Sequence, residues 1–406
     1  MSWETVRVQD IAEVFDGPHA TPPKSDDGPI YLGIPSILPD GGIDYENSKR
    51  ISYADFPKWT KRVTPRKDDV VFSYEANLES YAIIPEGFEG CLGRRMALMR
   101  PDTTRVNPRF LFYYMNSPQW RRVIAERTVL GATVNRIPIA TFPQFPIELP
   151  PLDIQERIAS TLMAYDNLIE NSRRQISLLE EAAQRLYKEW FVDLRIPGFG
   201  ASADRTNWTQ LPLTECATVI RGRSYTSTEI DGDEGVALVN LKNLRSFGGW
   251  NDGAEKTYSG AFKEEQHVSS GDIIMGVTDI TKERRLVGHV ALVPDLEREA
   301  IISMDLVKLV PVQVENLYLY AHLRFSGIAE SIALLANGTN VLHLKPQILS
   351  SVQIPIPSQN LQTDFARHME PMINEINLCS RRIASAQEAR DRLLPKLMSG
   401  EIEVEG

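Results

Sequence analysis

Short polar stretches of this chain carry side chains of the kinds that contact nucleic acid. Arg, Lys, Asn and Gln hydrogen-bond to base edges, and Arg and Lys also neutralise phosphates. In the first half the candidates are Lys61, Arg62, Arg66, Lys67, Tyr74, Glu75, Asn77, Arg94, Arg95, Asn135 and Arg136. In the second half they are Arg221, Arg223, Tyr225, Lys282, Arg284, Arg285, Asn340, His343 and Lys345. A solvated surface charge is the simpler explanation for any one of them, so the prediction rests on the set.

Motifs for catalysis are missing from the sequence. No G-x-x-x-x-G-K-[ST] phosphate loop occurs, so ATP-driven chemistry is not expected of this chain. The tetrapeptide that begins at Asn107 has Arg109 where amino-methyltransferases need Pro, and it sits where a helix should start. A charged turn at Asp295 and Glu297 lacks the Lys of a nuclease motif, and the 6 histidines have no metal-ligand spacing. We therefore expect no catalytic residue, metal or cofactor in this chain.

The composition is that of a globular protein. At 406 residues the chain should form two or three domains, and 42% hydrophobic with 24% charged residues supports a packed core. Neither a signal peptide nor a membrane-spanning run is visible, so a cytoplasmic protein is expected. The cysteines, Cys91, Cys216 and Cys379, are widely spaced and odd in number, which favours reduced thiols.

The net charge of −10 opposes DNA binding, because Lys and Arg supply most non-specific affinity for DNA. This objection loses force if the basic residues gather on one face, or if a partner subunit contacts the DNA backbone.

An internal repeat organises the chain. Trp3 and Gly17 recur as Trp208 and Gly222, at an offset of 205. The stretch GATVNRIPIATFPQFPIELPP matches GTNVLHLKPQILSSVQIPIPS without gaps, at an offset of 207. The two halves are therefore predicted to be copies of one unit. The two glycine-led stretches rank highest among the candidate DNA loops, because both copies keep Gly followed by polar or basic residues.

Each copy ends in an apolar seam with heptad spacing. The first seam is Ile158, Leu162, Tyr165, Ile169, Ser172, Ile176, Leu179, Ala183, Leu186 and Trp190. The second is Phe365, Met369, Met372, Ile376, Cys379, Ile383, Ala386, Arg390, Leu393 and Leu397. A core face of an ordinary bundle helix would explain one such stripe, but two in register favour a coiled coil.

Proline, glycine and helix-capping residues divide the chain into two globular domains, here called heads, and two helices. We predict a first globular domain over 1–151, a helix and linker over 152–200, a second domain over 201–357 and a final helix over 358–406. Asp153 is expected to cap the first helix with Glu156, and Pro371 to bend the second. The linker should lie around Pro197, Gly198 and Gly200.

The heads read as mixed structure, α/β or α+β. DDVVFSY and GDIIMGV are predicted strands, and NPRFLFYYMNS and ENLYLYAHLRFS are matching amphipathic helices. The whole chain is thus expected to be two globular domains separated by two long antiparallel coiled-coil helices, with a pseudo-two-fold internal repeat.

Three stretches resemble the specificity subunits of type I restriction-modification enzymes. They are PPLDIQERIASTLMAYDNLIE from Pro150, LYKEWFVDLRIPG from Leu186 and RLLPKLMSGEIEV from Arg392. The order of head, helix, head and helix extends the resemblance over the whole chain. It implies two target-recognition domains that each read one half of a split DNA site, with the helices setting the gap between the halves.

The resemblance also implies the partners. Two methyltransferase subunits would use S-adenosylmethionine to methylate adenine, and two motor-nuclease subunits would use ATP and Mg²⁺ for restriction. Independently of the resemblance, the duplicated unit favours binding to DNA, since a pseudo-two-fold particle suits the two-fold symmetric backbone of a duplex. Because the heads differ while the helices match, two dissimilar half-sites are expected.

Three other interpretations stay open. A coiled-coil scaffold that binds proteins would suit the acidic charge. A specificity subunit of a related restriction-methylation system would share the same plan. A nuclease or methyltransferase active by itself is the third, although no motif supports it.

Overall fold

The computed structural model describes residues 3–131, 134–197, 205, 207–230, 232 and 234–403. Two compact units are found. The first consists of Met1–Ile169 with Ala384–Gly406, and the second of Glu170–Ile383. Both ends of the chain therefore belong to the first unit. The expected linker residues Gly198 and Gly200 lie outside the described residues.

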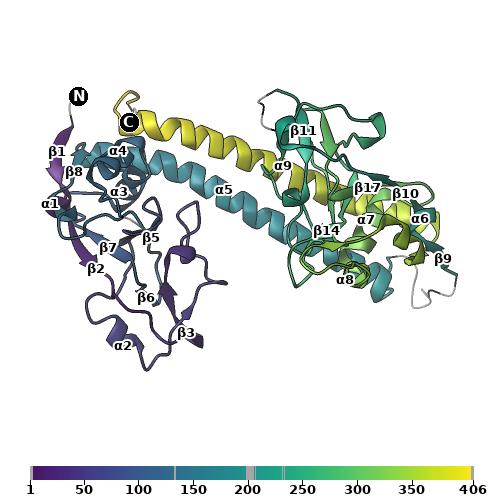
Figure 1. Ribbon diagram of the computed structural model, residues 1–406, viewed down its shortest axis with the longest axis horizontal. Helices are drawn as coiled ribbons and strands as arrows, with labels where there is room; N and C mark the ends of the chain where they lie inside the picture. Colours follow the sequence, from purple (N-terminus) through teal and green to yellow (C-terminus); the bar gives the residue numbers. More distant parts are fainter. Residues whose placement is uncertain are drawn as a thin grey trace. The chain divides into compact units, whose positions relative to one another are not determined.

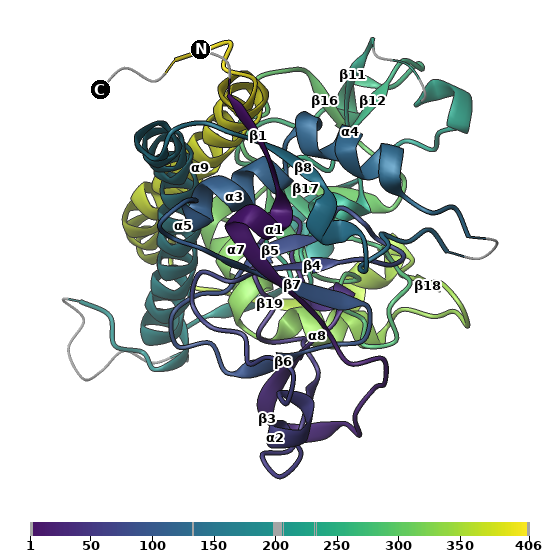
Figure 2. The ribbon, with the colours of Figure 1, turned by 90° about the vertical axis from the view of Figure 1, so that its left-hand side faces the viewer.

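The first unit is built on a four-stranded antiparallel sheet in the order β2-β7-β4-β5. These strands are β2 (Ala12–Asp16), β4 (Val70–Ser73), β5 (Tyr81–Ile83) and β7 (Met96–Pro101). Helix α3 (Pro108–Met115) packs on β4 and β5, and α4 (Pro118–Arg127) follows it (Figure 2). A parallel pair, β3 (Ser25–Leu32) with β6 (Gly90–Leu92), and the short helix α2 (Phe56–Trp59) complete this head.

The second unit repeats this topology. Its sheet has the order β10-β17-β13-β15. The strands are β10 (Ala217–Arg221), β13 (Ile273–Gly276), β15 (Val290–Leu292) and β17 (Leu306–Pro311). Strand β11 (Val236–Val239) pairs in parallel with β16 (Ala300–Ile302) and antiparallel with β12 (Lys256–Tyr258). Helices α7 (Asn316–Phe325) and α8 (Ile328–Leu334) correspond to α3 and α4. The predicted mixed fold with an internal repeat is confirmed.

Strand register fixes which residues are equivalent. Ala12 pairs with Pro101 as Ala217 pairs with Pro311. Val70 pairs with Met99 as Ile273 pairs with Leu309. Near the helices, two further strand pairs match: β1 (Glu4–Arg7) with β8 (Pro146–Leu149), and β9 (Thr209–Pro212) with β19 (Gln353–Ile356). The short helices α1 (Val8–Ile11) and α6 (Leu213–Cys216) follow β1 and β9.

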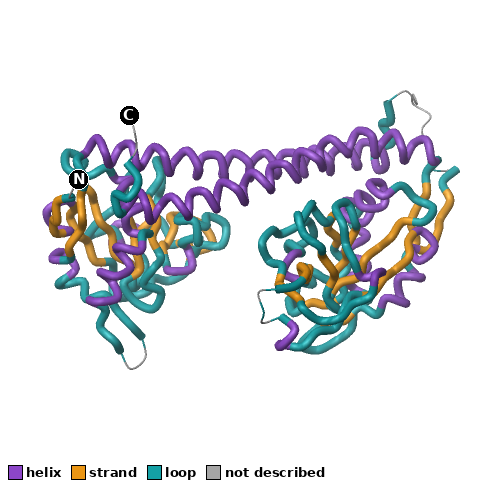
Figure 3. Tube along the Cα trace, turned by 90° about the horizontal axis from the view of Figure 1, so that it is seen from above, coloured by secondary structure: helices purple, strands orange, loops and turns teal. Residues whose placement is uncertain are grey.

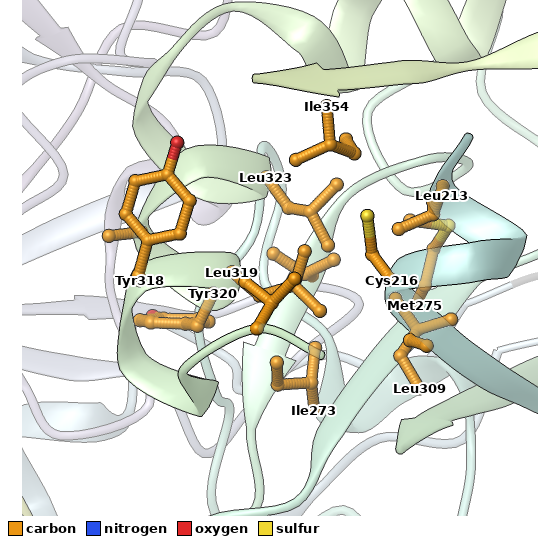
Figure 4. Close-up of a cluster of buried hydrophobic side chains, with 14 of the residues drawn as sticks. Leu213, Cys216, Ile273, Met275, Leu309, Tyr318, Leu319, Tyr320, Leu323 and Ile354 are labelled. Carbon is orange, nitrogen blue, oxygen red and sulfur yellow. The ribbon is translucent and has the colours of Figure 1, made fainter. Parts of the chain in front are cut away.

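The core of the second unit joins its sheet to its helices. Ile273, Met275 and Leu309 of the sheet meet Leu319 and Leu323 of α7 (Figure 4). All are fully or almost fully buried. Burying a Leu, Ile or Met side chain stabilises a fold by about 1.5–3 kcal/mol, so this cluster fixes α7 on the sheet.

Two long helices link the heads (Figures 1 and 3). Helix α5 (Leu152–Tyr187) is continued by a π-helical turn, Lys188–Val192, and α9 spans Gln359–Met398. The predicted cap at Asp153 is wrong, because the backbone N–H groups of Ile154 and Gln155 already donate to the Pro151 carbonyl, so that the helix begins earlier. Asp153 instead forms an ion pair with Arg157 at 3.0 Å. No helix of the described residues is long and apolar enough to cross a membrane.

The predicted seam is covered along both helices. Every apolar side chain of this set is buried or half-buried: Ile158, Leu162, Ile169, Ile176, Leu179, Leu186, Trp190, Phe365, Met369, Met372, Ile376, Ile383, Leu393 and Leu397. In the second unit the helices run antiparallel, since Gln175 bonds to Glu375 while Trp190 lies against Phe365. Their seams also enter the cores of the heads, where Ile158 and Leu162 cluster with Leu397.

Two buried glutamines perform the same task in each copy. Gln155 Nε2 donates to the Pro150 carbonyl, and its Oε1 accepts from the N–H of Asn107, the N-cap of α3. Gln362 does the same with Pro357 and with Glu315, the N-cap of α7. Each glutamine thus ties a long helix to the first turn of the helix that covers the sheet.

The charged member of the second seam, Arg390, has an acidic partner. Its guanidinium lies 2.8 Å from the carboxylate of Asp166 on α5, which also accepts a hydrogen bond from the Tyr113 hydroxyl. At the equivalent positions the second unit has Ala183, Ile373 and Ala321, which belong to or pack against its apolar core. The polar triad therefore exists in the first unit and is replaced by apolar packing in the second.

Replacing Arg390 by Ala should destabilise the first unit by about 1–2 kcal/mol, because Asp166 keeps its charge in a half-buried site without a cation. Urea unfolding of the full chain measures this. The matched control is Arg392→Ala on the same helix, whose exposed pair with Glu388 should contribute less than about 0.5 kcal/mol. Equal effects of both substitutions would contradict the assignment.

Candidate nucleic-acid interface

In the first unit, one end of the four-stranded sheet gathers many of the predicted contact residues. Strand β2 ends at Asp16, β4 ends just before Tyr74, and β7 begins just after Arg95. The register places Asp16 opposite Ala97 and Ser73 opposite Met96, so these ends are adjacent. Antiparallel pairing therefore brings together segments that are far apart in the sequence.

An ion pair joins two of these segments. Arg95 lies 2.5 Å from the carboxylate of Glu75, and the Tyr74 N–H donates to the Arg95 carbonyl. Burial raises the pKa of Tyr74 to about 12, and the nearby Asp16 and Glu75 carboxylates add to the effect. Arg94 remains exposed beside this pair. Tyr74 is therefore a neutral hydrogen-bonding group at neutral pH.

The stretch after Gly131 is attached to the same end. Arg136 exchanges backbone hydrogen bonds with Val129 and forms a bridge with Glu75, and the Asn135 carbonyl accepts from the Ala76 N–H. The side chains of Asn135 and Arg136 are exposed. Of the remaining candidates, the amide of Asn77 donates to Ser80 at 2.7 Å.

Lys61 and Arg62 lie on the other flank, beside β2. Arg62 donates to the Gly17 carbonyl at 3.0 Å and lies 3.9 Å from the Asp16 carboxylate. These side chains border a pocket of about 360 Å³ that Lys58 and Trp59 also line.

The equivalent end of the second sheet carries Arg221 and Arg223. Arg221 is exposed, whereas Arg223 donates to the Tyr258 hydroxyl at 3.1 Å and is only half-exposed. Lys256 lies 5.3 Å from the centre of the Tyr225 ring. Arg221 is thus the freer of the two arginines.

The matching glycine-led stretch again joins the sheet end. Strand β14 (Thr278–Asp279) pairs with β18 (Leu342–His343), as Glu75 pairs with Arg136 in the first unit. The side chains of Asn340, His343 and Lys345 are all exposed.

A buried carboxylate orders the basic loop that follows β14. Asp279 accepts hydrogen bonds from the N–H and hydroxyl of Thr281 and from the N–H groups of Leu286 and Val287. Burial alone would raise the pKa of Asp279, but these hydrogen bonds outweigh it and the pKa is lowered. The carboxylate therefore stays charged and holds both ends of the loop.

The three basic residues of this loop differ in exposure. Lys282 and Arg285 are exposed, while the Arg284 guanidinium donates to the Ala333 and Ala336 carbonyls at the end of α8. Arg284 thus anchors the loop, and Lys282 and Arg285 remain accessible. Among the described residues, no group of His, Cys, Asp and Glu is arranged to hold a metal ion.

Known proteins resemble this chain in sequence. Residues 1–181 match the family model described as the type I restriction modification DNA specificity domain. A type I restriction enzyme specificity subunit of Methanocaldococcus jannaschii is 25% identical over 426 residues, which cover 99% of this chain and 94% of the relative. A second such subunit, described as putative, is 24% identical with the same coverage. The chain is thus similar to type I restriction specificity subunits over almost its whole length.

A solved specificity subunit from M. genitalium shares the fold. Its TM-score is 0.59 at 16% identity, with 97% of this chain and 96% of that chain covered. At this identity the likeness concerns the fold alone, and it extends over both heads and both helices of this chain.

Two acids, Asp16 and Asp279, were not among the contact residues predicted from the sequence. Asp16 ends β2 beside Arg62, and Asp279 organises the second basic loop. The spacing Asp279-x-Thr281, in which an acid can accept from the backbone two residues on, was a usable signal for the second. Asp16 could be found from the repeat itself, because the offset of 205 that pairs Gly17 with Gly222 also pairs Asp16 with Arg221.

Asp279→Asn should loosen the 280–287 loop, because an amide cannot accept four hydrogen bonds as a carboxylate does. Hydrogen exchange of Leu286 and Val287 should rise at least tenfold at pH 7. In the unsubstituted chain the same loosening should appear as pH falls through the lowered pKa of Asp279, since the hydrogen bonds favour the charged form. Unchanged protection would contradict this role.

Proposed function

We propose that this chain is a specificity subunit that binds double-stranded DNA, with each head reading one half of a bipartite target. The supporting observation is that each copy gathers potential base contacts at the equivalent end of its own four-stranded sheet. Side chains there are donors and acceptors of the kinds that bind base edges. Equivalent positions carry different residues, as reading of two dissimilar half-sites requires.

We further propose that the chain has no catalytic role of its own. Two methyltransferase subunits with S-adenosylmethionine would methylate adenine, and two motor-nuclease subunits with ATP and Mg²⁺ would carry out restriction. The heads would then select the DNA sequence, and the two long helices would take part in assembly with the partner subunits. The chemistry would come from the partners.

The negative net charge is compatible with this proposal because the cations are locally concentrated. Lys58, Lys61 and Arg62 cluster beside β2, and Lys282 and Arg285 lie on the loop that Asp279 orders. Short-range contacts to phosphates depend on such local groups, since exposed charges more than about 10 Å away are screened at 0.1 M salt.

Arg136→Ala and Lys345→Ala should each weaken specific DNA binding by about 1–3 kcal/mol, the scale of one good base or phosphate contact. Titration of labelled target DNA with the assembled methyltransferase measures the loss. Arg392→Ala, which removes an exposed cation from α9, is the matched control and should leave the affinity within about twofold. Unchanged affinity in both head variants would remove these residues from the interface.

Salt titration of the same complex tests the proposal as a whole. Neutralised phosphates release counterions, so the logarithm of the affinity should fall linearly with the logarithm of salt concentration. A protein-binding scaffold would not bind DNA and would therefore show no such salt dependence. Absence of DNA binding at low salt would refute the proposed function.

A further inference from the structure

The two sheet ends have opposite charge patterns at equivalent positions. Register aligns Asp16, the last residue of β2, with Arg221, the last residue of β10. It also aligns Arg95, just before β7, with Asp305, just before β17. At each of these two positions, one head has an acidic residue where the other head has an arginine.

A second contact shows that these are true equivalents. Arg95 is paired with Glu75, and Asp305 accepts a hydrogen bond from the Thr278 hydroxyl at 2.9 Å. Glu75 and Thr278 both follow the central strands β4 and β13 at the same distance, and both lie in bridges to the glycine-led stretch. The bonded pair is retained while its polarity is reversed.

The flank beside β2 and β10 is inverted too. Counting back from Val70 and Ile273 places Lys61 and Arg62 at the positions of Glu264 and Glu265. Both turns contact the end of the edge strand beside them: Arg62 donates to the Gly17 carbonyl, and Gln266, next to Glu265, donates to the Arg221 carbonyl. The side chain of Glu264 is 99% exposed, so this turn would repel a phosphate.

Cations lie on the opposite flank in the second head. There Lys282 and Arg285 occupy the loop on the β15 side of the sheet, whereas the corresponding loop of the first head carries Glu79, which pairs with Arg121. Each head therefore offers phosphates one basic flank, and the two heads use different flanks. A head that contacts the phosphates of DNA with its opposite flank would present its sheet end to the bases in a different orientation.

Between the flanks, Asp16 and Arg221 hold opposite hydrogen-bonding capacities. The Asp16 side chain is 28% exposed: one carboxylate oxygen lies 3.1 Å from His19 and 3.9 Å from Arg62, and the other is buried without a hydrogen-bond partner among the described residues. A carboxylate oxygen has more than one acceptor site, so Asp16 can still accept from a further donor. Arg221 is exposed and can offer only donors.

We propose that this shared position reads a base in both heads, with Asp16 accepting from the amino group of cytosine and Arg221 donating to guanine. In the major groove, carboxylates accept from cytosine N4, and Arg bonds bidentately to guanine O6 and N7. This inference rests on the proposed function, because it assumes that the sheet ends meet DNA. It assigns opposite base preferences to one structural position of the repeat.

The test is binding-site selection from DNA with both half-sites randomised, using the complete methyltransferase complex. Asp16→Asn should reduce discrimination for cytosine at one position of one half-site by about tenfold to a hundredfold, and leave the other half-site unchanged. Arg221→Gln should do the same for a guanine in the other half-site. Glu46→Gln and Lys242→Gln, which alter exposed charges in the same heads, should leave both half-sites unchanged.

The remaining outcomes distinguish failure of this inference from failure of the proposed function. Retained DNA binding with unchanged base preferences in both variants would overturn this inference while leaving the proposed function standing. So would loss of preference for a base other than cytosine with Asp16→Asn, or other than guanine with Arg221→Gln. Failure of the unsubstituted complex to select any sequence would overturn the proposed function itself.

Discussion

The cores of both heads depend on the packing of helix segments that come from both halves of the chain. The first unit is closed by the start of α5 together with the last turns of α9, where Ile158 and Leu162 meet Leu397. The second unit contains the end of α5 and the start of α9, where Tyr187 and Trp190 surround Phe365. Neither head can bury its apolar surface with its own half of the sequence alone.

This constraint explains where sequence differences are tolerated. Gln155 and Gln362 keep identical contacts because they join a long helix to the helix that covers each sheet. The sheet ends lie outside this framework, so Asp16 and Arg221 can differ completely while the strands around them keep their register. The Tyr113, Asp166 and Arg390 triad shows that even a helix contact can diverge when complementary changes occur together.

Much of this architecture followed from the sequence, for physical reasons. Heptad spacing identified both helices, because the same face must be apolar at every turn, and the matched glycine-led stretches revealed the repeat. The start of α5 was missed because Pro151 supplies the first carbonyl of the helix, which a search for capping side chains overlooks. The difference between Asp16 and Arg221 was visible at the offset of 205, whereas the offset changes at the later strands, and only strand pairing shows that Arg95 corresponds to Asp305.

The shared closure of the cores has a consequence for how such a chain could arise. A half-length polypeptide with one head and one helix would leave its seam uncovered until it met a second copy of itself. Such a pair would have identical heads and, under the proposed function, could address only a symmetric sequence. Fusion of the two copies frees each sheet end to change on its own, and so permits an asymmetric address without any new fold.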